Sequence, residues 1–486
     1  MFTTNISPFL PVFGSEWGYD GIKWLQNGVE LEKKRGLCYN TPIMSQRHTQ
    51  TGRRGWQLPL SALCAAVALW GLGWSAWRIA TEGVGVLGVN NAVPWGWDIV
   101  NFVFWIGLGH AGTLISAVLL LTGKSWRGEI ARHAELMTLC AVCTAAVFPL
   151  VHVGRARMLW QMAPLPMASG VWPNPGSALV WDAAAISSYL LLSVLFWLMG
   201  MWGEHGPAAL RPTWARCCVL MAALLTPLVV TVHSVVGCDF ALTRRWYEPM
   251  IPPYFVCGAL LSGMAAVQLI ALCRGCSRTV TSKLSQLLLG LGCAMGLLYG
   301  LELLRTPTHW GVGYACLLAL NVGLPLLLAL PGLRSNRAAA ALVSCGVLPG
   351  MWLERAHIIV ERSVALTGGT YSPTGVDIAM LAGSVGLFLA LFLSLSARMP
   401  AEQTDPLSYL STPCPTHPAR SAAIGATVGA ATCALWAALT QWADTVGTLG
   451  SRPHGWEFWW PPLFVCALLG GGIAVFLHFI IQYRRS

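Results

Sequence analysis

Charged residues are what this 486-residue sequence has least of, at 10% of its positions. An ordinary soluble chain carries about 25%. Hydrophobic residues make up 55% of the sequence, and the 24 tryptophans gather largely at the ends of apolar segments, as an interfacial aromatic belt would place them. A surface this poor in charge does not suit water. We therefore expect an all-α, polytopic transmembrane helix bundle whose first partner is membrane lipid.

Motifs that hold cofactors within a chain are also scarce. Most of the 16 cysteines lie inside apolar segments, and there is no C-x-x-C-H motif for covalent haem. Cys273 and Cys276 have C-x-x-C spacing, but no second pair and no nearby histidine accompany them. We expect no metal site, no haem and no iron–sulfur cluster in this chain. The first fifty or so residues are polar and basic, so no cleavable signal peptide is expected.

A basic stripe is missing too, although the formal net charge is +10. The basic residues are scattered between apolar segments, which argues against a nucleic-acid partner. They are denser in the N-terminal tail and in the loops that follow even-numbered segments. By the positive-inside rule both termini are cytoplasmic, and the loops after odd-numbered segments are periplasmic.

Twelve apolar segments are long enough to span a bilayer, which takes about twenty residues. They lie near 57–79, 97–121, 134–153, 178–202, 213–236, 252–273, 284–304, 311–330, 338–360, 377–397, 421–443 and 458–482. Glu354 and Arg355 interrupt the ninth segment; as neighbours on a helix they should need separate partners.

The predicted organisation has four parts. A basic cytoplasmic tail over 1–55 precedes a ten-helix body over 56–400. A Pro-rich linker over 401–420 separates this body from a two-helix membrane anchor over 421–486.

The densest chemistry lies between Phe148 and Asp182, where F-P-L-V-H-V-G-R ends one segment and L-V-W-D begins the next. His152, Arg155 and Asp182 fall at these ends, at the predicted periplasmic face. Ionisable residues at membrane depth are expensive and mark functional sites by default. A histidine and a carboxylate beside an apolar cleft suit a quinol, whose hydroxyls need acceptors that also take protons. Arg155 would hold Asp182 or the quinone oxygen.

Further polar groups follow along the segments, most of them on the outer half. The candidates are Asp98, Asn101, His110, Glu135, His233, Asp239, Tyr254 and Glu302. Structural roles compete with functional ones: His110 and Asn101 are equally well explained as hydrogen-bonding glue between helices, and Glu135 as an interfacial carboxylate near Arg132.

Four motifs carry a resemblance to a known family: W-G-W-D-I-V-N-F-V-F-W, F-P-L-V-H-V-G-R, P-L-V-V-T-V-H-S-V-V-G-C-D-F-A and P-P-Y-F-V-C-G-A. Over roughly 57–400 the sequence resembles the NrfD family, the polysulfide-reductase-type, quinone-reactive membrane subunits. Within the family it is most similar to the ActC-type subunit of bacterial alternative complex III. Through R-P-H-G-W-E-F-W-W-P-P-L-F, the last segments resemble the two-helix ActD anchor, which implies a fusion of two subunits.

The resemblance implies a respiratory subunit of the bacterial inner membrane that oxidises menaquinol or ubiquinol near the periplasmic face. Electrons would pass to a periplasmic iron–sulfur, molybdopterin-like subunit and on to haem c subunits, beside a paralogous NrfD-like membrane subunit. The redox centres would lie on these partner chains. His152 and Asp182 match the proposed catalytic pair, with Asp98, Asn101, Arg155, Asp239 and Tyr254 around the quinol. His110, Glu135, His233 and Glu302 match a proton path.

Three other functions remain open. A molybdenum-enzyme anchor that reduces polysulfide or a similar acceptor would share the fold and differ in its partner chains. A transporter would show paired interrupted helices in two halves; Pro227 and Pro325 are present, but matching halves are not. A haem b quinol oxidase would need an axial pair such as His110 and His233, which an absorption spectrum would reveal.

Overall fold

A computed structural model describes residues 56–154, 178–205, 207, 210–242, 251–305 and 312–399, without the side chains of 178–184 and of some further helix-end residues. The chain divides into two units, Met1–Trp56 and Gln57–Ser486, and every described helix belongs to the second. The N-terminal tail, the linker over 401–420 and the predicted helices over 421–443 and 458–482 lie outside the described residues.

The described part of the chain is helical and contains no strand, as the sequence predicts. Its long rods are α2 (Gln57–Glu82), α3 (Trp97–Leu121), α4 (Ala131–Ala145) continued by α5 (Val147–His152), α6 (Ala178–His205), α7 (Arg211–Leu242), α8 (Ile251–Arg274) and α9 (Arg278–Arg305). Two interrupted rods follow. The first consists of α10 (Val312–Leu318), η5 (Ala319–Gly323), α11 (Leu324–Leu326) and η6 (Leu327–Ala329), and the second of α13 (Arg337–Ala356), η7 (His357–Glu361) and α14 (Arg362–Thr367). The last described helix is α15 (Gly375–Arg398). Short connections form η1 (Val84–Leu87), η2 (Ser125–Glu129) and α12 (Pro331–Arg334).

All ten helices predicted within 56–400 are present. Among the described residues, nine rods are long and apolar enough to cross a membrane, and the α13 rod is the one left out. That rod carries Glu354 and Arg355, the residues that interrupt the ninth apolar segment. The protein is a multi-pass membrane protein.

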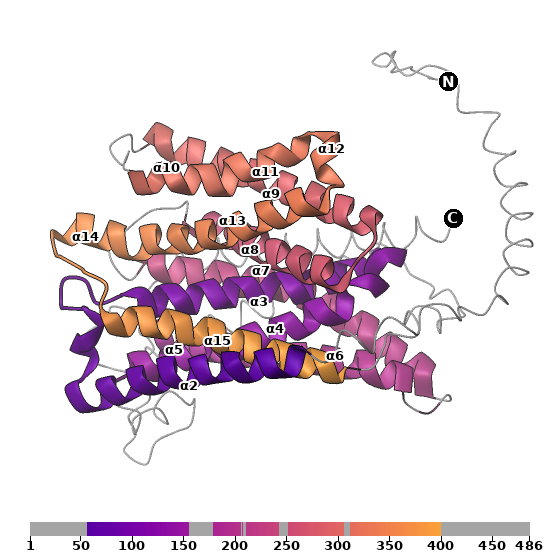
Figure 1. The fold of residues 1–486 in the computed structure, drawn as a ribbon, viewed down its shortest axis with the longest axis horizontal. Coiled ribbons are helices and arrows are strands. Elements are labelled where there is room, and N and C mark those ends of the chain that lie inside the picture. Colours follow the sequence, from indigo (N-terminus) through magenta and orange to yellow (C-terminus); the bar gives the residue numbers. More distant parts are fainter. Residues whose placement is uncertain are drawn as a thin grey trace, which may run out of the picture. The chain divides into compact units, whose positions relative to one another are not determined.

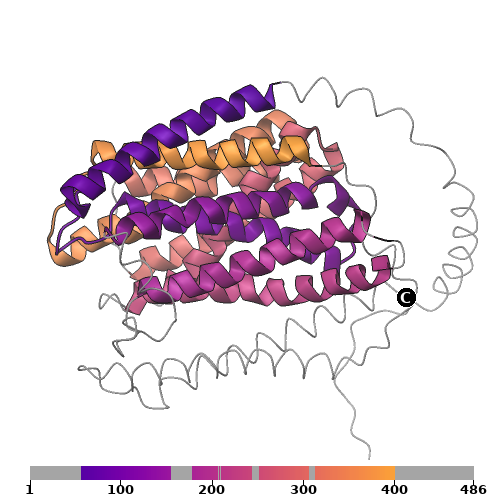
Figure 2. The ribbon, with the colours of Figure 1, turned by 90° about the horizontal axis from the view of Figure 1, so that it is seen from below.

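Helix α3 runs through the middle of the bundle and packs against α4, α7, α8 and α13 (Figures 1 and 2). Nearly all of its residues are buried, from Asp98 to Leu121. Its glycines allow this, because a Cβ on Gly112 would lie 2.3 Å from the carbonyl oxygen of Ala134. Small residues of this kind let membrane helices approach closely.

Helices α2 and α15 are far apart in sequence but lie side by side (Figure 1). A Cβ on Gly71 would lie 2.4 Å from the carbonyl oxygen of Ala379, and one on Gly383 would lie 2.8 Å from the backbone nitrogen of Leu72. The two backbones therefore touch along a seam of small residues. Much of the outward surface of α2 is apolar and exposed, including Leu69, Trp70 and Trp77, which suits a helix in contact with lipid.

The two ends of the bundle are named here by the carboxylates they carry. The Asp98 end holds the start of α3, the end of α5, the end of α14 and the start of α15. The Glu135 end holds the end of α3, the connection η2 and the start of α4.

Candidate quinol site and buried polar groups

Asp98 and His152 form the contact at the centre of the candidate site. His152 Nδ1 lies 2.7 Å from Asp98 Oδ2. The Asp98 side chain is fully buried, whereas the His152 side chain keeps 23% of its surface exposed. Asp98 Oδ2 accepts a hydrogen bond from the Nδ1–H group, so Nε2 remains as the ring nitrogen for another partner. This is the arrangement of a histidine base oriented by a carboxylate.

Local structure explains why these two side chains meet. Asp98 lies in the first turn of α3, and its Oδ1 accepts a hydrogen bond from the backbone N–H of Gly96 at 3.3 Å. His152 is the last residue of α5, which packs on α3. Gly154 then stops the chain in a left-handed conformation, with φ of 69° and a Cβ position only 2.6 Å from Val84. A larger residue there would be strained, because its φ is left-handed and its Cβ would meet the Val84 side chain.

Asn101 lies one turn deeper on α3 and is also fully buried. Its Oδ1 accepts a hydrogen bond from Trp352 Nε1 at 2.7 Å, while its Nδ2 has no hydrogen-bond partner among the described residues. The rings of Trp97 and Trp352 meet edge to face at 4.8 Å. Asn101 thus lies beside an aromatic wall, with one donor available for a ligand or a water molecule.

His110 and His233 meet at mid-depth, where their ring centroids are 4.6 Å apart. Each is about 1% exposed, and none of the four ring nitrogens has a hydrogen-bond partner among the described residues. The ring of Tyr189 lies 4.4 Å from that of His110. Four unpaired polar atoms at one buried place usually indicate internal water or a transferable proton.

Glu354 and Arg355 correct an expectation from the sequence. Although they are neighbours on α13, they bind each other, with Glu354 Oε2 3.3 Å from Arg355 Nη1. Arg355 also lies over the ring of Phe255 at 4.4 Å and donates to the Phe255 carbonyl oxygen at 3.2 Å. A Cβ on Gly258 would lie 2.7 Å from the Arg355 guanidinium, so only glycine leaves room for the pair.

Tyr254 and Glu302 belong to a third cluster. Tyr254 donates its hydroxyl hydrogen to Glu302 Oε2 at 2.7 Å, and Arg362 forms an ion pair with the other carboxylate oxygen. Tyr299 stacks on Tyr254 at 5.5 Å. Asn321 donates to the Tyr299 hydroxyl at 3.1 Å and to the Gly350 carbonyl oxygen at 3.0 Å, which connects this cluster to α13, the helix of the Glu354–Arg355 pair.

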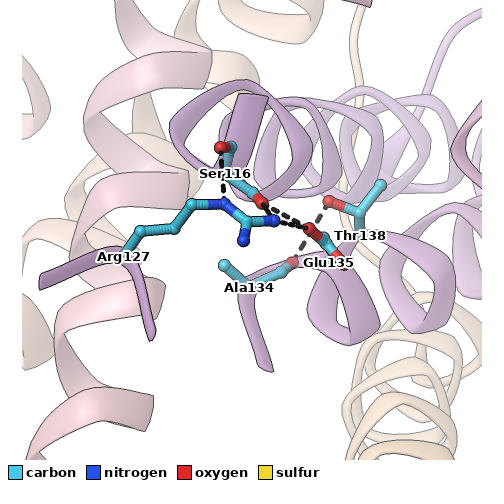
Figure 3. Close-up of polar contacts among 5 residues, drawn as sticks. All are labelled: Ser116, Arg127, Ala134, Glu135 and Thr138. Carbon is cyan, nitrogen blue, oxygen red and sulfur yellow. Dashed lines mark hydrogen bonds and ion pairs between the residues drawn. The ribbon is translucent and has the colours of Figure 1, made fainter. Parts of the chain in front are cut away.

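Glu135 lies at the opposite end of the bundle, between α3 and α4 (Figure 3). It accepts a hydrogen bond from the Ser116 hydroxyl and pairs with Arg127 at 3.3 Å. Arg127 also donates to the Ser116 carbonyl oxygen at 3.4 Å. Both charged groups are about 5% exposed, so the carboxylate predicted near Arg132 is a buried ion-pair partner of Arg127.

Three predicted residues cannot be placed. Arg155 lies outside the described residues. Asp182 lies in α6 and Asp239 in α7, but their side chains lie outside the described part of the chain. Their roles remain predictions. In the same described part, no group of three or more His, Cys, Asp or Glu side chains could hold a metal ion.

The structure therefore joins Asp98 to His152, His110 to His233, and Tyr254 to Glu302, and keeps Glu135 apart from all of them. Sequence reasoning missed the carboxylate–histidine contact itself, because it paired His152 with Asp182. A signal was present: Asp98 opens α3 as His152 closes α5, so alternate helix directions bring both to one end.

Much of this sequence matches a known family of membrane proteins. The family model described as "Polysulphide reductase, NrfD" matches residues 85–367. The chain belongs to the NrfD family. That match includes the Asp98–His152 pair and the three buried polar groups described above, His110–His233, Glu354–Arg355 and Tyr254–Glu302.

Individual relatives agree with this placement. The chain is similar to a putative membrane subunit of a dimethyl sulfoxide reductase of Halobacterium salinarum, with 26% identity over 73% of this chain and 92% of that protein. It is also similar to the integral membrane subunit of an Hdr-like menaquinol oxidoreductase of Archaeoglobus fulgidus, with 24% identity over 37% of this chain and 42% of that protein.

A different class of membrane protein also shows similarity. The voltage-gated ClC-type chloride channel ClcB of Escherichia coli O157:H7 is 27% identical over 60% of this chain and 65% of that protein. Apolar helices draw on few residue types, so unrelated membrane chains share identities through composition. The family match, which rests on position-specific patterns over 85–367, carries more weight.

Proposed function

We propose that this chain is the quinol-oxidising membrane subunit of a respiratory oxidoreductase, with His152 as the proton acceptor and Asp98 as the carboxylate that orients it. The observation that carries the proposal is the 2.7 Å contact between a half-buried histidine and a fully buried carboxylate at one end of the bundle. The NrfD family match and a relative named as a menaquinol oxidoreductase subunit support the quinol as substrate.

The chemistry requires a base at this position. A quinol that becomes a quinone releases two protons and two electrons. His152 Nε2 takes the proton of one hydroxyl, and the buried Asp98 stabilises the imidazolium that results. Asn101 and the Trp97–Trp352 wall contact the ring. The second hydroxyl of the quinol is assigned to Asp182 and Arg155, with Asp239 nearby.

The two electrons leave for an iron–sulfur partner chain. We propose the arrangement of alternative complex III, with an iron–sulfur, molybdopterin-like subunit at the periplasmic face, haem c subunits and a paralogous NrfD-like membrane subunit. In this arrangement the Asp98 end faces the periplasm and both termini face the cytoplasm. The menaquinol named for one relative favours menaquinone over ubiquinone.

A molybdopterin-enzyme anchor is the alternative, and the relative named as a dimethyl sulfoxide reductase membrane subunit supports it. The same site would serve it, and only the partner chains would differ. Identification of the chains that co-purify decides between them: haem c subunits favour the first, and a molybdenum enzyme without haem c favours the second.

Proton transfer across the bundle is the second part of the proposal. Buried polar groups succeed one another from Glu302 and Tyr254, through Glu354, which Arg355 holds as an ion pair, to His233 and His110. Glu135 stands at the other end. The unpaired ring nitrogens of the two histidines support internal waters that complete the path.

The test uses the complete complex purified from membranes. His152→Ala and Asp98→Asn are each expected to lower quinol-dependent electron transfer by about 10²- to 10⁴-fold, the usual contribution of a positioned base, while the complex still assembles. Asp182→Asn is expected to do the same. Full quinol oxidation by His152→Ala would overturn the site.

A further inference from the structure

Two loops meet beside Asp98 and are tied together by hydrogen bonds and close packing. They are residues 83–96, which lead into α3, and residues 368–374, which lead into α15. Asn90 Nδ2 donates to the carbonyl oxygen of Thr370 at 2.9 Å. A Cβ on Gly88 would lie 2.7 Å from the carbonyl oxygen of Ser372. We call these residues the loop pair.

Tyr371 is the residue of the loop pair that reaches α3. Its hydroxyl oxygen accepts a hydrogen bond from the backbone N–H of Trp97 at 3.0 Å, and its hydroxyl hydrogen goes to Asp377 Oδ2 at 3.2 Å. Trp97 is the first residue of α3 and directly precedes Asp98. Tyr371 therefore holds one of the backbone N–H groups that a helix start leaves without an intrahelical partner.

Asp377 makes the tyrosine a fixed anchor. The same carboxylate oxygen also accepts from the backbone N–H of Thr374 at 2.9 Å, while the Asp377 backbone N–H donates to the Thr374 hydroxyl oxygen at 3.3 Å; these two bonds form a capping box that begins α15. Burial and the nearby Asp377 carboxylate raise the pKa of the Tyr371 hydroxyl. The hydroxyl thus stays protonated and points its hydrogen at Asp377, leaving its oxygen lone pairs for Trp97.

The space around the tyrosine shows how closely it is fitted. A Cβ on Gly96 would lie 3.0 Å from both the hydroxyl oxygen and Cε2 of Tyr371. Gly96 is also the residue whose N–H binds Asp98 Oδ1. One tyrosine thus contacts both backbone residues that set the position of the Asp98 carboxylate.

We propose that Tyr371 is a positioning residue for the quinol site, which fixes the first turn of α3 and through it the Asp98 carboxylate that orients His152. This inference rests on the proposed function of the Asp98–His152 pair. The hydrogen bonds of the Tyr371 hydroxyl go to the Trp97 backbone and to Asp377, not to the His152 ring. The effect of Tyr371 should pass entirely through Asp98.

The experiment compares variants in the complete, purified complex. Tyr371→Phe keeps the ring and removes the hydroxyl; kcat for quinol oxidation is expected to fall about tenfold, the size of effect that losing one buried hydrogen bond produces. KM for quinol is expected to change far less, because the lost hydrogen bond is to the Trp97 backbone, while the rings of Trp97 and Trp352 keep their contact with each other. In an Asp98→Asn background, the same substitution is expected to cause no further loss, since residues acting as one unit are not additive.

Two further variants make the test sharper. Gly96→Ala pushes the Tyr371 hydroxyl away from Trp97 without altering the tyrosine, so it should lower kcat as Tyr371→Phe does, and the double variant should be no worse than either. Asn90→Ala loosens the loop pair without touching Trp97 or Asp98, so it should turn over at the wild-type rate.

The possible outcomes separate the two proposals. Full turnover by Asp98→Asn overturns both the quinol site and the role of Tyr371. Loss in Asp98→Asn with full turnover in Tyr371→Phe overturns the positioning role alone. A Tyr371→Phe loss that multiplies in the Asp98→Asn background, or that Asn90→Ala reproduces, also overturns it, because the effect would then be general loosening.

Discussion

Several charged and histidine side chains are buried in this protein at a cost in free energy, which indicates that they serve its function. Glu354, Arg355, Asp98, His110 and His233 are each between 0% and 2% exposed. A bundle that needed only stability would carry apolar side chains there, because buried ion pairs are poor stabilisers and buried polar atoms need partners. Their presence fits the handling of protons.

Among these buried residues, Glu354 provides a direct test of proton transfer. Glu354→Gln keeps the shape and removes the titratable group. We expect quinol oxidation to continue while the number of protons moved per electron falls, when both are measured in liposomes that contain the complete complex. Glu361→Gln is the matched control, because Glu361 is exposed and pairs with His357 outside the buried path. An unchanged proton-to-electron ratio in Glu354→Gln would remove Glu354 from the path.

The Glu135–Arg127 pair is expected to dominate stability at its own end. Glu135→Leu or Arg127→Met alone removes one partner of this buried ion pair, which costs about 3–5 kcal/mol. The double variant should be more stable than either single variant, since both charges of the pair are then gone. Thermal unfolding in detergent measures this order. Additive losses in the double variant would show that the two residues act separately.

The residue types could be predicted from sequence, but their pairings only in part. His152 was recognised from the cost of a histidine at a segment end, and Asp98 and Asn101 were placed around the same pocket. Their contact depends on how the ends of α3 and α5 align, which no local pattern encodes. For Glu354 and Arg355 the sequence predicts separate partners, whereas the structure shows a direct ion pair. Adjacent helix positions diverge by about 100°, yet the long arginine side chain turns back to its neighbour.

The positions of whole helices can be predicted from the sequence more accurately than the π-helical segments that interrupt them. Hydropathy predicts most ends of the described rods to within about three residues, because about twenty apolar residues must cross the bilayer. It misses the end of α7 at Leu242, the start of α9 at Arg278 and the end of α14 at Thr367 by more, since these helices continue past their apolar segments. The π-helical segments η5 and η7 were not foreseen. η5 carries tertiary contacts: Asn321 donates to the Gly350 carbonyl oxygen and to the Tyr299 hydroxyl. Such segments are common at functional sites.

Helix packing gives a prediction with an internal control, since α2 carries two glycines with different surroundings. Gly71→Ala would place its Cβ 2.4 Å from the Ala379 carbonyl oxygen, whereas a Cβ on Gly73 meets nothing within 4 Å. We expect Gly71→Ala to cost about 1–3 kcal/mol by forcing α2 from α15. Gly73→Ala should be neutral or slightly stabilising, because alanine favours helix over glycine. Thermal unfolding of the two variants measures the difference, and equal stability would contradict the close seam.

The whole molecule has two chemically different ends. The Asp98 end gathers a carboxylate–histidine pair, an aromatic wall and the Glu302–Arg362 pair. At the Glu135 end, arginine side chains hold helix ends together: Arg337 donates to the carbonyl oxygens of Leu272 and Cys276. The positive-inside rule predicts that the arginine-rich end faces the cytoplasm.

Topology fusions test this orientation. Alkaline phosphatase, which is active only in the periplasm, is expected to be active when inserted after Asn90 in the loop pair. Inserted after Ser277, at the other end of the bundle, it should be inactive. The reverse pattern would place the quinol site at the cytoplasmic face and would demand a cytoplasmic electron acceptor.

The seam between α2 and α15 also has a consequence for biosynthesis. About 290 residues separate the end of α2 at Glu82 from the start of α15 at Gly375. At a ribosomal rate of about 5–20 residues per second, α2 waits roughly 15–60 s in the bilayer before its neighbour is made. During that interval Gly71 and Ser75 face lipid or an insertion factor. Among the described helices, the bundle therefore closes last along α2, and a nascent chain arrested before Gly375 leaves this small-residue face of α2 without its partner helix.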